Sequence, residues 1–191
     1  MNEKKLVLTK TALQLFYANG INSIGINEIL KASGIAKKTL YNHFSSKEEL
    51  ILSTLEYRDN IFCQWFKSIL DSKKSGRESI IALFYGLDDW FNNRVAELGD
   101  FKGCFFINTA AEYGDPSSVV RLYCKEHKNK IRMLVTEKVS LFIRNQDSRK
   151  VLVNAISLFK EGAIVSASVE GNTDAALKCL PTLLKLINEE C

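Results

Sequence analysis

Proline and glycine are scarce in this sequence. Its 191 residues include only two prolines and ten glycines, and both residue types interrupt or weaken helices. Apolar residues recur at helical spacing through most of the chain, and no segment shows the strict alternation that is typical of a strand. The sequence therefore predicts an all-α protein of about nine helices.

Cysteine and histidine are also few. The five cysteines are an odd number without a CxxC pair, so neither a disulfide framework nor a zinc knuckle is indicated. Cys124 and His127 stand three residues apart on one helical face and could ligate a metal, with Cys104 as a further ligand. The two ligands of this pair are too few for a site, so we expect neither a metal nor a cofactor.

Motifs of the common enzyme classes are missing. The sequence contains no Walker A, GxSxG, HExxH or GxGxxG pattern, and the Cys124–His127 spacing does not by itself give the geometry of Cys–His catalysis. No uncharged apolar run approaches the length of a membrane span, and the N-terminus lacks the apolar stretch of a signal peptide. We therefore expect a cytoplasmic protein that is neither an enzyme nor membrane-bound.

Positive charge is concentrated near the N-terminus. The first fifty residues contain seven lysines against four glutamates, and no acidic residue occurs between Lys31 and Lys47. A solvated helix face would account for this pattern. A basic patch confined to one small module also suits binding to a polyanion such as DNA.

Two short predicted helices surround this patch. They cover Ile26–Ser33 and Lys37–Phe44, and the tight turn Gly34–Ala36 joins them, which is the pattern of a helix-turn-helix. The second helix of such a motif enters the major groove, where side chains reach base edges and phosphates. Its polar face would present Lys37, Lys38, Thr39, Tyr41, Asn42 and His43.

The segment Ile29–Leu50, ILKASGIAKKTLYNHFSSKEEL, resembles the DNA-binding signature of the TetR family. The resemblance implies an all-helical homodimer, usually a repressor, with a helix-turn-helix domain over 1–47 and an effector-binding and dimerisation domain over 48–191. It further implies that Lys37 to Thr39 approach bases and nearby phosphates, whereas Tyr41, His43 and Lys47 hold the DNA backbone. Ala36 and Lys38 depart from the family, which often has Ser and Gly there.

The region 80–130 is rich in aromatic residues beside a few polar groups. Such a composition could line a pocket between helices for a mostly apolar or aromatic effector, although ordinary core packing would account for each aromatic residue taken singly. The segment Phe101–Pro116 resembles, more loosely, the C-terminal domain of some TetR-family members. The candidate ligand-binding residues are Trp90, Phe105, Phe106, Asn108, Glu112, Tyr123 and His127.

The last two predicted helices are apolar on more than one face. Val151–Val169 and the helix that follows carry apolar residues all round, which indicates burial on several sides. Either these helices lie in an ordinary core, or residues 148–189 form a homodimer interface, as the resemblance implies. The sequence thus predicts a homodimeric repressor of a palindromic operator, released by a small-molecule effector. The alternatives are a DNA-binding regulator without a ligand and an enzyme that uses the C-terminal cavity.

Overall fold

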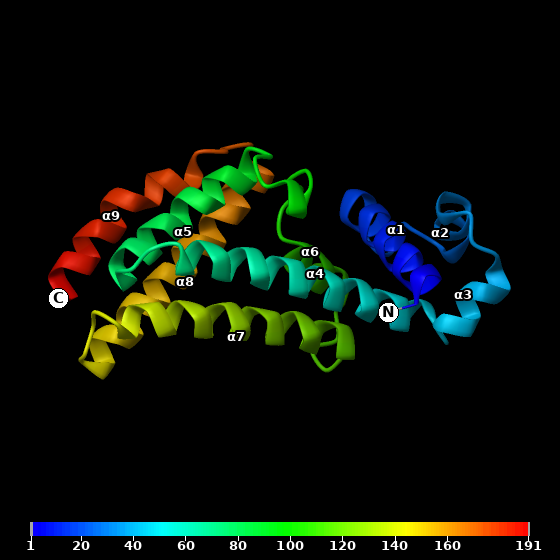
Figure 1. The fold of residues 1–191 in the computed structure, drawn as a ribbon, viewed down its shortest axis with the longest axis horizontal. Coiled ribbons are helices and arrows are strands. Elements are labelled where there is room, and N and C mark those ends of the chain that lie inside the picture. Colours follow the sequence, from blue (N-terminus) through cyan, green and yellow to red (C-terminus); the bar gives the residue numbers. More distant parts are fainter. Residues whose placement is uncertain (1, 191) are drawn as a thin grey trace. The chain divides into compact units, whose positions relative to one another are not determined.

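The computed structural model describes residues 2–190, which form nine α-helices and one short 3-10 helix, with no strand among them (Figure 1). This confirms the predicted all-α class. The elements are α1 (Glu3–Asn19), α2 (Ile26–Ser33), α3 (Lys37–His43), α4 (Lys47–Asp71), α5 (Gly76–Phe91), η1 (Ala96–Leu98), α6 (Phe105–Glu112), α7 (Val119–Ser140), α8 (Gln146–Val169) and α9 (Ala175–Glu190).

The chain divides into two compact units. The N-terminal unit combines Met1–Asn60 with Cys104–His127, and the C-terminal unit combines Ile61–Gly103 with Lys128–Cys191. The long helices α4 and α7 therefore each contribute residues to both units. The expected division after residue 47 separates the chain by role and stays a prediction. It differs from these compact units because α6 and the first turns of α7 belong with the N-terminal helices.

The core of the N-terminal unit lies where α1 packs on α2 and α3. Phe16 of α1, Ile29 of α2 and Leu40 of α3 are each at most 2% exposed, and Phe44, which ends α3, is buried with them. Burying one such side chain contributes about 1.5–3 kcal/mol. These residues form one apolar cluster, and they fix α3 with its polar side outward.

Polar side chains define where several helices begin. Ser46 Oγ accepts a hydrogen bond from Glu49 N at 3.1 Å, and the Glu49 carboxylate reaches back to Ser45 N, which starts α4. The Ser45 backbone and side-chain hydrogen bonds lower the pKa of Glu49. Asn145 caps α8, which consequently begins five residues before the predicted Val151.

The starts of α5 and α7 differ in their capping. α5 begins directly after Ser75, whose side chain makes no cap hydrogen bond. Asp115 Oδ1 accepts a hydrogen bond from Ser117 N at 2.8 Å and forms a local turn, so α7 does not begin there. The helix starts at Val119 instead, with Ser118 Oγ accepting a hydrogen bond from Arg121 N. Short Asp side chains favour such turns as readily as helix caps, because both bonds are local.

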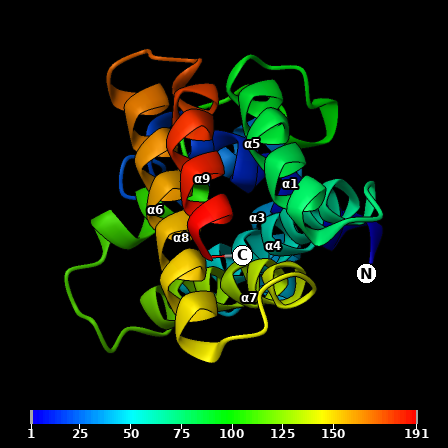
Figure 2. The same ribbon diagram turned by 90° about the vertical axis from the view of Figure 1, so that its left-hand side faces the viewer.

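In the C-terminal unit α8 and α9 lie side by side, and α5 packs against both (Figure 2). The inner face of α8 is buried, whereas Val151, Leu158, Val165 and Val169, elsewhere on the same helix, are exposed. By length and composition alone α8 could cross a membrane, because an 18-residue window within it has a mean hydropathy of 1.3. The ion pair of Lys160 with Glu161 lies within the helix, and core helices of soluble proteins pass the same test.

Candidate nucleic-acid interface

A left-handed glycine joins α2 to α3. Gly34 has φ +69°, and its N–H donates to Leu30 O at 3.0 Å, which ends α2. Residues with a side chain rarely adopt this φ, so the turn needs glycine here. Ala36 precedes α3 in an extended conformation and offers no side-chain cap, as its departure from Ser predicts. Together the turn and α3 form the expected helix-turn-helix.

The outer face of α3 is polar and basic. Lys37, Lys38, Tyr41 and Asn42 are exposed, and Thr39 and His43 are half-buried. Tyr41 is 48% exposed, which rules out the core position that its aromatic ring could otherwise suggest. Leu40 and Phe44 pack into the core on the inner side of α3. The six predicted DNA-facing side chains therefore lie on the outer side, which a nucleic acid could reach.

Lys47, the seventh predicted DNA-binding residue, is placed differently. It is half-buried, its ammonium donates to Ile21 O at 2.7 Å, and it lies 5.7 Å from the centroid of the Phe16 ring. Its charge therefore stabilises the turn between α1 and α2. A DNA phosphate contact would have to share or replace this bond.

Glu112, predicted to bind an effector, holds the same turn. Its Oε1 accepts a hydrogen bond from Ile21 N at 2.8 Å, and its Oε2 accepts one from Asn22 N at 2.7 Å. Glu112 is the last residue of α6. Its carboxylate therefore ties α6 to the beginning of the helix-turn-helix module.

Comparisons with known proteins agree with this geometry. The sequence profile described as "Bacterial regulatory proteins, tetR family" matches residues 8–54. The chain is 41% identical over 76 residues to the HTH-type transcriptional regulator YuxN of Bacillus subtilis, and 27% identical over 114 residues to the HTH-type transcriptional repressor NemR of Escherichia coli. These matches cover 40% and 60% of this chain, and 25% and 56% of the relatives.

Solved structures extend the likeness to the whole chain. SCO4454, a TetR-family transcriptional regulator from Streptomyces coelicolor, superposes with a TM-score of 0.86 at 25% identity, covering 100% of this chain and 97% of that one. The reduced form of Escherichia coli NemR has a TM-score of 0.78 at 20% identity, covering 96% and 97%. Residues 8–54 therefore match the DNA-binding region of the TetR family, and the whole chain has the fold of a TetR-family regulator.

The curated relatives inform the DNA-binding end of this chain most strongly. The chain spans between a fifth and half of the length of the first three curated relatives that it matches. The likeness to NemR, below 25% identity between the structures, concerns the fold alone. What this chain binds through its remaining helices therefore has to be argued from its own residues.

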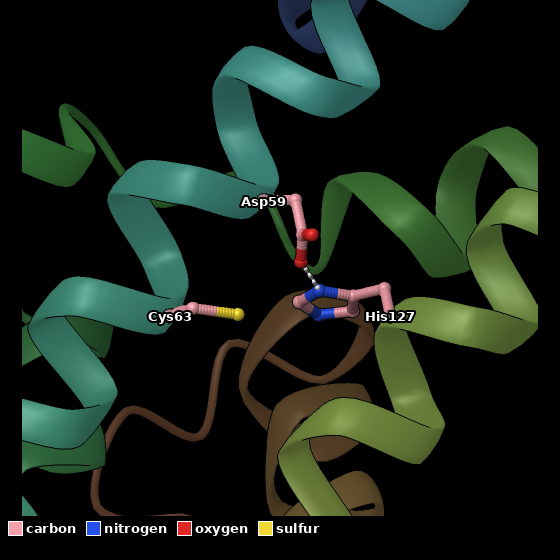
Figure 3. Close-up of side chains that lie close together, drawn as sticks. All are labelled: Asp59, Cys63 and His127. Atoms are coloured by element: carbon pink, nitrogen blue, oxygen red, sulfur yellow. Dashed lines mark hydrogen bonds and ion pairs between the residues drawn. The ribbon is translucent and has the colours of Figure 1, made fainter.

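The other predicted effector residues of the N-terminal unit have contrasting environments. Phe105 and Phe106 are buried, Tyr123 is half-buried, and Asn108 is exposed. The Phe106 ring stacks on His127 with 3.5 Å between centroids. His127 Nδ1 in turn shares a hydrogen bond with Asp59 Oδ1 (Figure 3). Cys63, also labelled there, lies one turn beyond Asp59 on α4, in the C-terminal unit.

Trp90, the predicted effector residue of the C-terminal unit, is 1% exposed. Its ring meets Phe62 edge-on at 5.3 Å and Phe101 edge-on at 4.9 Å between centroids. Core packing thus accounts for its aromatic surface. Its indole Nε1, however, is buried without a hydrogen-bond partner among the described residues.

Two buried charged residues of α4 were not predicted as functional. Arg58 and Asp59 are each 4% exposed, on a stripe with Leu55 and Phe62. Burial lowers the pKa of the Arg58 guanidinium, which lies 5.0 Å from the Tyr17 ring centroid. The available signal was a pair of charges at positions where helical spacing otherwise places apolar side chains.

Proposed function

We propose that this TetR-family chain is a transcriptional repressor that binds a palindromic operator as a homodimer and is released by a small-molecule effector. The single observation that carries the proposal is the exposed, basic outer side of α3. Lys37, Lys38, Tyr41 and Asn42 are exposed there, within a stretch that lacks acidic residues from Lys31 to Lys47. Basic and polar side chains in such a position can bind phosphates and the acceptor atoms of guanine in the major groove.

Exposed apolar residues of α8 support the homodimer. Val151, Leu158 and Val165 recur every seven residues, so they lie along one face, and they are 52%, 72% and 46% exposed. Large apolar side chains exposed along one helix face favour association. A two-fold contact through residues 148–189 would supply two α3 helices for two half-sites one DNA turn apart, and hence a palindromic operator.

The buried indole N–H of Trp90 supports an effector. A buried donor without a partner costs about 1–3 kcal/mol, and an acceptor atom of a bound molecule would recover that energy. The effector would be mostly apolar or aromatic, since Phe62 and Phe101 surround the ring. The ligand roles predicted for Phe105, Phe106, Asn108, Glu112, Tyr123 and His127 remain part of this proposal.

The effector must bind the DNA-incompetent state more tightly than the competent one, because a ligand shifts a conformational equilibrium only through differential affinity. A hundredfold preference corresponds to about 2.7 kcal/mol. We place the protein in the cytoplasm, where a bacterial operator lies. The rival function is a regulator without an effector, in which the aromatic residues only fill the core.

Footprinting of the purified protein on the DNA upstream of its own gene tests the proposal. We expect protection of two half-sites about one helical turn apart, which the double variant Lys37→Ala/Lys38→Ala abolishes. Lys125→Ala, an exposed lysine on α7, is the control and should protect the same bases as the wild type. Protection that survives the double variant would contradict the assigned face. Candidate effectors are then screened for loss of the footprint.

A further inference from the structure

Two opposite charges hold one peptide group between α1 and α2. The Ile21 carbonyl accepts a hydrogen bond from Lys47 Nζ at 2.7 Å, and the N–H of the same peptide group, that of Asn22, donates to Glu112 Oε2 at 2.7 Å. The other carboxylate oxygen accepts from Ile21 N at 2.8 Å. The ammonium thus meets the negative end of the peptide dipole, and the carboxylate meets its positive end.

This arrangement is stronger than an ordinary loop hydrogen bond. All three bonds join a charged group to a backbone group, and such bonds are roughly twice as strong as bonds between neutral partners. Ile21 is 1% exposed, and the bonds of its N–H and its carbonyl are partly buried. Water therefore competes with them less effectively than with a surface pair.

Gly20 makes room for the carboxylate. It ends α1 with φ +85°, and a Cβ added there would lie 3.3 Å from Glu112 Oε1. A side chain at this position would be strained by its backbone conformation and would also press on the carboxylate. The turn is therefore adapted to Glu112 in both backbone conformation and space.

The three elements that meet here have different places in the regulator. Lys47 is the first residue of α4, and Glu112 is the last residue of α6. The peptide that they hold lies three residues before α2, and α2 leads through Gly34 into the recognition helix α3. A shift of α6 would therefore act on the helix-turn-helix through this peptide.

We propose that Glu112 is a positioning residue for DNA binding: its carboxylate, with Lys47, fixes the Ile21–Asn22 peptide and so sets the placement of α2 and α3. The inference rests on the proposed operator binding. It assigns Glu112 to the N-terminal module in addition to the effector role predicted for it. It also means that Lys47 chiefly stabilises the turn between α1 and α2.

Glu112→Gln tests the role, because glutamine keeps the shape but offers one neutral oxygen where two charged ones accept bonds. We expect operator affinity to fall about tenfold, by the same factor for preferred and altered operators, since no base contact is removed. The Ile21 and Asn22 amides should exchange with solvent at least tenfold faster, while those of α8 keep their protection. Glu97→Gln, exposed in η1, is the control and should change neither quantity.

Lys47→Met provides a second, independent test, since methionine keeps an aliphatic side chain over Phe16 and removes the ammonium. Because both charges act on one peptide, the double variant should speed Asn22 exchange by less than the product of the single effects. Operator affinity of Glu112→Gln within twofold of the wild type would overturn the proposal. Fast exchange of the Ile21 and Asn22 amides in the wild type would overturn it even if the variant did not fold. A wild type that binds no DNA but protects these amides would refute the proposed function. It would leave intact the finding that Glu112 and Lys47 hold the Ile21–Asn22 peptide.

Discussion

The Nδ1 of His127 lies 2.6 Å from Oδ1 of Asp59, and the two side chains are only 1% and 5% exposed. The pair joins α4 to α7 inside the N-terminal unit (Figure 3). A carboxylate buried to this degree depends on its hydrogen-bond partners, because the low-dielectric interior disfavours a charge that nothing compensates. Phe106 covers the imidazole by stacking, which fixes the ring facing Asp59.

Replacing the imidazole by a ring without a donor should therefore destabilise the protein. We expect His127→Phe to lower the free energy of unfolding by about 3 kcal/mol, since Asp59 loses a buried partner. Denaturant titration measures this change. Lys125→Ala, two residues earlier and exposed, should stay within about 0.5 kcal/mol of the wild type. A loss below about 1 kcal/mol for His127→Phe would show that the pair contributes little.

The proposed dimer interface can be tested with two equally exposed apolar residues. Leu158 on α8 is 72% exposed and Met133 on α7 is 70% exposed. Leu158→Glu should give a monomer by light scattering and weaken operator binding on the order of a hundredfold, because each half-site then acts alone. Met133→Glu should stay dimeric. Ile164, only 1% exposed, is unsuitable, since a charge there would disrupt the core of the protomer itself. A dimeric Leu158→Glu would place the interface elsewhere.

Glu161 predicts a pH dependence of stability. Burial alone would raise its pKa, but the ammonium groups of Lys160 and Lys128 outweigh burial and hold the pKa of Glu161 below its ordinary value. The ionised carboxylate therefore stabilises the folded state at neutral pH, and this contribution is lost as pH falls from the unfolded pKa through the folded one.

Thermal melting between pH 7 and pH 3.5 measures this contribution. The melting temperature of the wild type should fall more steeply on acidification than that of Glu161→Gln, which lacks the titrating group. Glu97→Gln should follow the wild type, because Glu97 is exposed. Equal slopes for the wild type and Glu161→Gln would refute this role.

The two lysines at the start of α3 should differ in what they contribute. Lys37→Ala should weaken binding to all sequences and reduce the magnitude of the salt slope by about two, one phosphate contact for each protomer. Lys38→Ala should instead relax the preference at one base pair of each half-site, at about 1–3 kcal/mol. Titrations at several salt concentrations, on the operator and on single-base variants, separate the two effects. Identical behaviour of both variants would contradict this division.

Local patterns in the sequence were sufficient to predict the helix-turn-helix. The two helices, the glycine turn and the inward Leu40 and Phe44 depend on bonds and spacing within about twenty residues. The exposure of Lys37, Lys38 and Tyr41 follows from the same amphipathic pattern. The all-α class was predictable for a similar reason, because the scarcity of helix breakers acts on each helix separately.

Contacts between distant segments could not be predicted in this way. Glu112 reaches a turn ninety residues earlier in the chain, and Asp59 pairs with a histidine 68 residues later. A glutamate beside aromatic residues predicts a ligand contact as readily as a backbone contact. Only the tertiary arrangement shows which partner Glu112 has, and the same holds for the orphaned indole N–H of Trp90.

Selection of binding sites from random DNA tests the central claim most directly. The purified wild type, the Lys38→Ala variant and the Leu158→Glu variant would each be incubated with a random duplex library, and the bound fraction sequenced. We predict that the wild type enriches one motif with two inverted half-sites about one helical turn apart. Lys38→Ala should enrich a motif altered at matching positions of both halves, and Leu158→Glu should enrich none. Failure of the wild type to enrich any sequence, or enrichment of an unrepeated motif, would contradict the account.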